Sequence, residues 1–219
     1  MSTNTQTTEP ESPGIDKARF TEPHVGNVVG YWFSHLVALG YCGVILAAIS
    51  TQFTQHEMPC PLCMLQRMAM VLIGIGAIWM VGQARKGTLT LGGYVRCYSL
   101  MIFGALLGYM MSRRQVLLHI LPGDPGYGGT VLGYHLYTWA ALTFLIVLLY
   151  TAIMLLFVKG TFPIAPAGKG ALWTSRIIVW FFWFVIALNA VLVFLEEGLH
   201  WYLPDDPTSY LLLQQLGIG

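Results

Sequence analysis

Five long runs of apolar residues most constrain what this chain can fold into. They occupy residues 28–53, 62–83, 93–112, 131–158 and 177–196. A helix that crosses the hydrocarbon core of a bilayer needs about 20 consecutive, mostly apolar residues, and each run has roughly that length. Only 10% of the residues are charged, which is too few for a soluble domain of this size. The sequence therefore predicts an all-α integral membrane protein, with a four-helix transmembrane bundle and a fifth, C-terminal transmembrane helix.

The basic residues predict how these helices are oriented. With the amino terminus inside, the cytoplasmic side holds most of the 11 basic residues: Lys17, Arg19, Arg85, Lys86, Arg96, Lys159, Lys169 and Arg176. Arg67, Arg113 and Arg114 lie towards the outside, and the latter two are expected to close the third helix. Cytoplasmic loops of membrane proteins carry an excess of Lys and Arg, so this distribution supports a cytoplasmic amino terminus.

The two ends of the chain predict its remaining organisation. Residues 1–27 are rich in Thr, Glu, Ser and Pro and are expected to form a disordered cytoplasmic tail. Residues 159–219 are expected to form a cytoplasmic loop, the fifth transmembrane helix and an outer segment that rests on the interface. No glycine pattern for nucleotide binding and no basic face for nucleic acid is present, so no nucleic-acid partner is expected.

The motif Cys60-Pro-Leu-Cys63 precedes the second apolar run, on the side predicted to be outside. Two cysteines at this spacing, on an oxidising face of the membrane, can form a reversible disulfide. An inert structural disulfide is the alternative, but so short a closed loop constrains the unfolded chain little. Cys42 and Cys97 lie within the first and third runs and are expected to be buried, inert residues.

The residues after this motif favour a reactive pair. Pro61 has no backbone donor and suits the first turn of a helix, which would place Cys63 among the free amide groups of that turn. Such a position stabilises a thiolate. Arg67 follows one helical turn later, and a buried arginine at a membrane boundary requires a partner or a function. Snorkelling to the outer headgroups is the alternative for Arg67.

The stretch Cys60-Pro-Leu-Cys-Met-Leu-Gln-Arg67, between the first two membrane runs, resembles the signature of the DsbB family of bacterial disulfide-bond-formation proteins. The resemblance covers residues 28–158, the predicted four-helix membrane domain with the CxxC in its first outer loop. It implies a multi-pass protein of the bacterial cytoplasmic (inner) membrane. It further implies a thiol:quinone oxidoreductase that reoxidises a soluble DsbA-like thiol oxidase on the outer, periplasmic face and reduces ubiquinone or menaquinone.

The resemblance also implies roles for individual residues. Cys63 would be the cysteine that faces the quinone, and Cys60 the outward cysteine exposed to thiol exchange. Arg67 would support the quinone. Gln115 and His119, in the stretch that leaves the third helix, would be further quinone-pocket residues.

This chain departs from the family pattern in one loop. Family members hold a second cysteine pair between their third and fourth helices, whereas residues 113–131 of this chain contain no cysteine. The partner's thiol would therefore attack the Cys60–Cys63 disulfide directly, another protein would supply the shuttle pair, or the chain would carry out a related but different redox reaction. A fifth membrane helix is a second departure.

Two other functions are consistent with some of these residues. Cys60, Cys63 and the predicted outer-face histidines, namely His56, His119, His135 and His200, could bind or deliver a soft metal ion such as Cu(I) or zinc. Against this, Arg67 would place a positive charge beside the cation. A haem held by His35 and His135 is the other alternative, but the two histidines are predicted to lie at different depths in the membrane.

Overall fold

The computed structural model describes residues 25–54, 58–124, 126–200 and 209–217, so residues 1–24 of the predicted tail lie outside the described part. Within it, five helices are long and apolar enough to cross a membrane, which confirms the predicted all-α membrane fold. They are α2 (Val25–Thr54), α3 (Pro61–Arg85), α4 (Leu91–Leu118), α5 (Leu136–Leu156) and α7 (Lys169–Glu197). The short elements are β1 (Thr130–Val131), β2 (Tyr134–His135), α6 (Val158–Thr161), η1 (Gly198–His200) and α8 (Leu211–Gln215).

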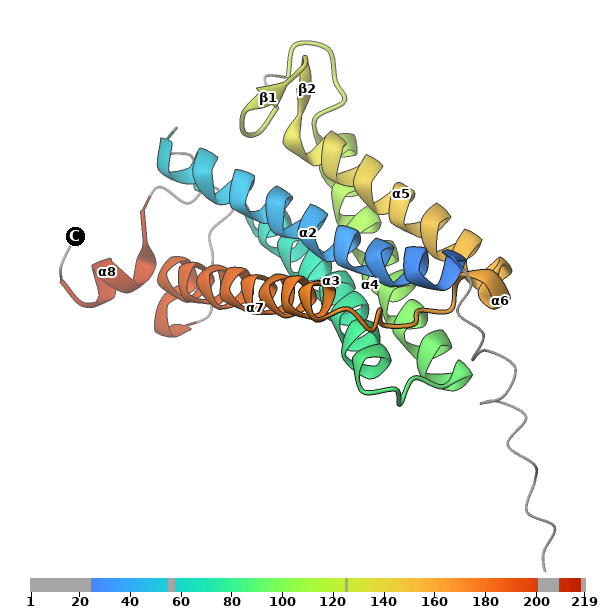
Figure 1. Cartoon of the computed structure of the whole chain (residues 1–219). Coiled ribbons are helices and arrows are strands. Elements are labelled where there is room, and N and C mark those ends of the chain that lie inside the picture. Colours follow the sequence, from blue (N-terminus) through green and yellow to red (C-terminus); the bar gives the residue numbers. More distant parts are fainter. Residues whose placement is uncertain (1–24, 55–57, 125, 201–208, 218–219) are drawn as a thin grey trace, which may run out of the picture.

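Helices α2 to α5 form one bundle, and α7 lies along α2 and α3 (Figure 1). Glycines allow two of the close approaches between helices. A Cβ atom on Gly108 of α4 would lie 2.2 Å from the ring of Phe144 on α5, and one on Gly74 of α3 would lie 2.3 Å from the ring of Phe182 on α7. The missing side chains therefore let two buried rings fill the space between helices.

Helix α7 is joined to α2 by buried hydrogen bonds near both of its ends. Near its start, Ser175 accepts a 2.6 Å hydrogen bond from the Tyr31 hydroxyl and lies 2.8 Å from Nε2 of His35. Near its end, Glu196 accepts a hydrogen bond from the side-chain amide of Gln52. Polar groups that are buried in a membrane helix must find partners, so these bonds fix α7 against the bundle.

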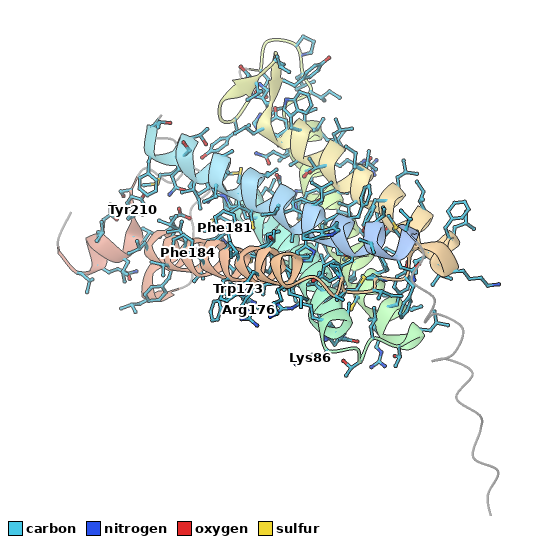
Figure 2. The ribbon with its side chains drawn as sticks, in the orientation of Figure 1. Lys86, Trp173, Arg176, Phe181, Phe184 and Tyr210 are labelled. Atoms are coloured by element: carbon cyan, nitrogen blue, oxygen red, sulfur yellow. The ribbon has the colours of Figure 1, made fainter. Side chains whose placement is uncertain are left out.

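The opposite side of α7 is apolar and exposed. Figure 2 shows Trp173, Arg176, Phe181 and Phe184 along this side, and the Arg176 guanidinium lies 5.2 Å from the centre of the Trp173 indole. Trp173 and Phe184 are 61% and 63% exposed. In a membrane-spanning helix, such a surface faces lipid.

Two predicted helix boundaries were wrong. Helix α4 does not close at Arg113 and Arg114 but continues to Leu118, because both arginine side chains are exposed and no proline follows until Pro122. The fourth membrane helix starts at Leu136, not at residue 131, because residues 130–135 form the β1–β2 hairpin, whose turn contains Gly133 with a φ of 81°. Both changes fall at the end of the bundle that holds the start of α3, where the candidate site lies.

Candidate functional site

The two motif cysteines lie at the start of α3. Cys60 is the N-cap residue, with extended backbone angles, and Pro61 opens the first turn, where its lack of an N–H group is no loss. The backbone N–H of Cys63 donates a 3.3 Å hydrogen bond to Cys60 Sγ, so the Cys60 side chain caps the helix. The two sulfur atoms lie 2.7 Å apart, and a disulfide requires about 2.05 Å. The helix start therefore holds both thiols close to the geometry of a disulfide.

Gln115 of α4 contacts both sulfur atoms. Its Nε2 group donates hydrogen bonds of 3.4 Å to Cys60 Sγ and 3.5 Å to Cys63 Sγ. Its side-chain oxygen accepts a 2.7 Å hydrogen bond from Nε2 of Gln66, which fixes the direction of the Gln115 amide. Gln115 is 1% exposed, so it contributes these dipoles in a place from which water is excluded.

Cys60 is buried, although it was expected to be the outward and exposed cysteine. It is 7% exposed, whereas Cys63 is partly exposed and lines a cavity. The hydrogen bond to Cys63, followed by burial, raises the pKa of the Cys60 thiol above its ordinary value. Met58, which lies just before this helix start, is held by a 2.5 Å hydrogen bond from the Tyr127 hydroxyl to its carbonyl oxygen. A partner thiol would therefore meet a Cys60 sulfur that is buried in this conformation.

Arg67 is buried one turn deeper in α3 and does not reach towards the headgroups. It is 5% exposed and donates hydrogen bonds of 3.4 Å to Gln52 Oε1 and 3.3 Å to the carbonyl oxygen of Ala48. Gln52 in turn donates to Glu196 and, over 3.2 Å, to the Tyr210 hydroxyl. The arginine is thus part of a polar chain that connects α3 to α2, α7 and the start of α8.

A cavity of about 250 Å³ joins these groups at the end of the bundle where α3 starts. Its polar edge contains Cys63, Gln66, Arg67 and Gln115. The rest of the wall comes mainly from α2, α5 and the loop before α5: Val44, Ala47, Ala48, Thr51, Met58, Pro59, Met70, Tyr127, Gly128, Val131, Leu136, Tyr137, Trp139, Ala140 and Thr143. A largely apolar cavity with a few converging polar groups and aromatic rings is typical of a binding site for a small molecule.

His119 lies away from this site. Its ring nitrogen Nδ1 is 3.0 Å from Asp124 Oδ1, and its ring stacks on that of Tyr137 with 5.8 Å between the centres. The N–H of Gly126, together with His119, lowers the pKa of Asp124. The structure therefore brings Cys60, Cys63, Arg67 and Gln115 together, whereas His119, the C-cap residue of α4, does not line the cavity.

The sequence analysis missed three polar residues of this region. Gln66 orients Gln115, Gln52 binds Arg67, and Glu196 binds Gln52. Each is a polar side chain within or at the end of an apolar run, and that signal could have marked them as buried and partnered. Their partners lie 49, 15 and 144 residues away in the chain, which no local pattern reveals.

The residues considered for metal or haem binding are dispersed. Within the described ranges, no group of three or more His, Cys, Asp and Glu side chains gathers, and His56 lies outside those ranges. His35 is buried and bonded to Ser175, while Nδ1 of His135 lies 3.2 Å from the Gly128 carbonyl oxygen. The local geometry instead supports thiol chemistry.

Comparisons with known proteins agree with this geometry. Residues 31–127 match the model of the family "Disulfide bond formation protein DsbB". The disulfide bond formation protein B of Chromobacterium violaceum is 36% identical over 91 residues, which cover 41% of this chain and 51% of that protein. The chain thus matches about half the length of this curated relative. No solved structure matches the chain.

Proposed function

We propose that this chain, whose residues 31–127 match the model of the DsbB family of disulfide bond formation proteins, is a membrane thiol:quinone oxidoreductase. Its substrate would be a soluble, DsbA-like dithiol protein on the outer face of the bacterial inner membrane. The observation that carries this proposal is the placement of Cys63. Its sulfur lies 2.7 Å from that of Cys60, and the same residue lines an apolar cavity with Arg67 and Gln115.

The first half of the proposed reaction is thiol–disulfide exchange. A thiolate of the partner attacks Cys60 Sγ, the Cys60–Cys63 bond breaks, and Cys63 leaves as a thiolate. The partner's second thiolate then attacks the mixed disulfide and releases Cys60, which takes up a proton. The partner loses two electrons and two protons. The cysteine pair gains both electrons and one proton, on Cys60, and the other proton passes to water, from which a proton is taken up again when the quinol forms. The raised pKa of Cys60 favours its release as a neutral thiol.

The second half restores the disulfide. A quinone bound in the cavity would accept two electrons and two protons and leave as the quinol while the Cys60–Cys63 bond re-forms. Arg67 and Gln115 supply the donors that could hold oxygen atoms of the ring, and Tyr127, Tyr137 and Trp139 supply aromatic surface. Gln115 also stabilises negative charge on Cys63 through its Nε2 group.

The missing loop cysteines make a direct attack on Cys60 the simplest route. Residues 113–131 contain no cysteine, so this loop cannot relay a disulfide to Cys60. The loop instead contacts the segment that precedes Cys60, through the bond from Tyr127 to Met58. Docking of the partner on this loop would therefore be a means of moving Met58 and exposing Cys60.

The experiment that tests this function measures quinone reduction by the purified protein, with a reduced dithiol oxidase as the donor. Wild type is compared with Cys60→Ala and Cys63→Ala, and Cys42→Ala and Cys97→Ala are the matched controls. We expect turnover that depends on Cys60 and Cys63 and is unchanged in the two controls, because Cys42 and Cys97 are buried in the bundle. An active Cys63→Ala protein would exclude the mechanism.

A metal analysis of the same samples distinguishes the alternative function, metal binding or delivery, from thiol oxidation. Wild-type protein that reduces no quinone, yet binds zinc or Cu(I) in a manner that depends on Cys60 and Cys63, would favour metal binding or delivery. Turnover that is unaffected by chelators supports thiol oxidation.

A further inference from the structure

Glu196 lies in the fifth membrane helix, outside the region that matches the DsbB family model, yet it reaches the Arg67 side of the candidate site. It is the penultimate residue of α7, is 2% exposed and accepts a hydrogen bond from Nε2 of Gln52. Figure 1 shows the end of α7 beside α8, and Figure 2 shows Tyr210, which also accepts a bond from Gln52, in this region. The proposed mechanism uses none of these groups.

The contacts of Glu196 determine which way the Gln52 amide points. A carboxylate accepts hydrogen bonds only from donors, so it selects the NH₂ end of the amide. The oxygen end is then turned to Arg67, whose guanidinium donates to it over 3.4 Å. With the amide reversed, its NH₂ group would face the guanidinium, donor against donor. Glu196 therefore fixes the direction of a chain of hydrogen-bonded groups that runs from α7 to the cavity wall: the Glu196 carboxylate, the Gln52 amide and the Arg67 guanidinium.

The charges agree with this order. A buried arginine in a membrane helix requires a compensating charge. Among the described residues the acidic side chains are Asp124, Glu196 and Glu197, and Glu196 is the one that hydrogen bonds join to Arg67, through Gln52. Its second oxygen, Oε2, has no hydrogen-bond partner within the described part of the chain. The carboxylate thus retains an open acceptor position beside this polar chain.

We propose that Glu196 is a positioning residue for quinone binding: through Gln52 it holds the Arg67 guanidinium at the wall of the cavity. This inference rests on the proposed function, because the proposed function supplies the quinone that Arg67 would hold. It assigns the fifth helix a part in the site, in addition to its packing against α2. No hydrogen bond between Arg67 and either sulfur atom is present among the described residues, so thiol exchange at Cys60 should change less than quinone binding when this chain of contacts is broken.

The test compares Glu196→Gln with wild type and with Glu197→Gln, which removes the same charge from the adjacent position. Binding of a short-chain ubiquinone is measured by quenching of tryptophan fluorescence, since Trp139 lines the cavity. Steady-state turnover and the rate at which dithiothreitol reduces the Cys60–Cys63 disulfide are measured on the same samples. For Glu196→Gln we expect the quinone Kd and KM to rise about tenfold, the effect of one hydrogen bond to a charged group. The value of kcat, disulfide reduction and all properties of Glu197→Gln should stay near wild type.

Two further variants keep the inference falsifiable. Glu196→Asp keeps the charge and should recover part of the quinone affinity. Gln52→Leu removes the middle of the chain and should reproduce the loss even if Glu196→Gln does not fold. Unchanged Kd in both Glu196→Gln and Gln52→Leu, or a loss of disulfide reduction equal to the loss of quinone binding, would overturn the positioning role while leaving the thiol oxidase intact. Wild-type protein that binds no quinone would overturn the proposed function and this inference with it.

Discussion

At the scale of single residues, the site depends on how one buried amide is oriented. Gln66 donates to the Gln115 oxygen, so the Gln115 NH₂ group must point at the sulfur atoms. A second buried amide, Gln52, shows the same arrangement next to Arg67, where Glu196 fixes its orientation. Amides are useful in this role because they carry no net charge and still offer a directed donor.

Replacing Gln115 by Leu should slow reoxidation of the reduced cysteine pair by quinone about tenfold. The change removes the donor to Cys63 and leaves Gln66 without its acceptor, and a hydrogen bond to a charged group contributes about 1.5–3 kcal/mol. Stopped-flow quinone reduction by the prereduced protein measures this rate. Gln83→Leu, at the far end of α3, is the control. Equal rates for the two variants would contradict a role for Gln115.

The raised pKa of Cys60 gives a prediction about pH. The shift favours the neutral Cys60 thiol in the folded protein. The contribution of this thiol to the free energy of unfolding is therefore present below the ordinary thiol pKa, and it is lost as the pH rises through the raised pKa. In the reduced protein, alkylation of Cys60 by iodoacetamide should therefore begin only above the pH range of an ordinary thiol. Cys63→Ala removes the main cause and should move this profile to lower pH. Mass spectrometry of the alkylated peptide measures it, and coincident profiles would mean that Cys63 does not raise the pKa of Cys60.

The sequence predicted the reactive part of the site but not its support. Cys60, Cys63 and Arg67 form a local motif, and the structure groups them with Gln115, as the family resemblance implied. The burial of Cys60 was not predictable, because its sulfur packs against a residue from another helix, Gln115, which lies 55 positions away. His119, one turn beyond Gln115, lies close to Asp124 and stacks on Tyr137 of the cavity wall, so its role in the pocket stays a prediction.

At the scale of helices, the fifth span belongs to the bundle and is not a separate anchor. Phe182 of α7 is 2% exposed and occupies the space left by Gly74 of α3. Length and apolarity predicted that α7 exists, but its start at Lys169 was not predicted, since residues 169–176 contain two basic and two hydroxyl residues. Ser175 explains why this polar stretch is part of the helix, because its hydroxyl accepts a hydrogen bond from Tyr31 of α2 inside the protein.

Replacing Gly74 by Ala should destabilise the folded protein. The new methyl group would lie 2.3 Å from the Phe182 ring, and overpacking of this kind costs about 1–3 kcal/mol. Gly82→Ala in the same helix is the matched control, because its methyl group would meet no atom within 4 Å and a helical alanine gains roughly 0.5–1 kcal/mol over glycine. Thermal unfolding in detergent compares them. A Gly74→Ala protein as stable as Gly82→Ala would mean that α7 is not held against α3.

At the scale of the whole molecule, the distribution of charge predicts one orientation. The turn between α3 and α4, with Arg85 and Lys86, should face the cytoplasm, and the loop between α4 and α5 should face outward. Alkaline phosphatase needs an oxidising compartment for its disulfides, so a fusion at Gly123 should be active and one at Gly87 inactive. Fusions of green fluorescent protein at the same sites should give the reverse pattern. Active phosphatase at Gly87 would invert the proposed topology.

The placement of both reactive thiols on a single helix start has a consequence for kinetics. With Cys42 and Cys97 buried, at 1% and 0% exposure, the molecule has one couple that holds two electrons or none. Under the proposed function, the protein partner and the quinone must use this couple in alternation, since no second couple can store charge between them. Double-reciprocal plots at several partner concentrations would then be parallel lines, the ping-pong pattern of an enzyme that completes one half-reaction before it begins the other.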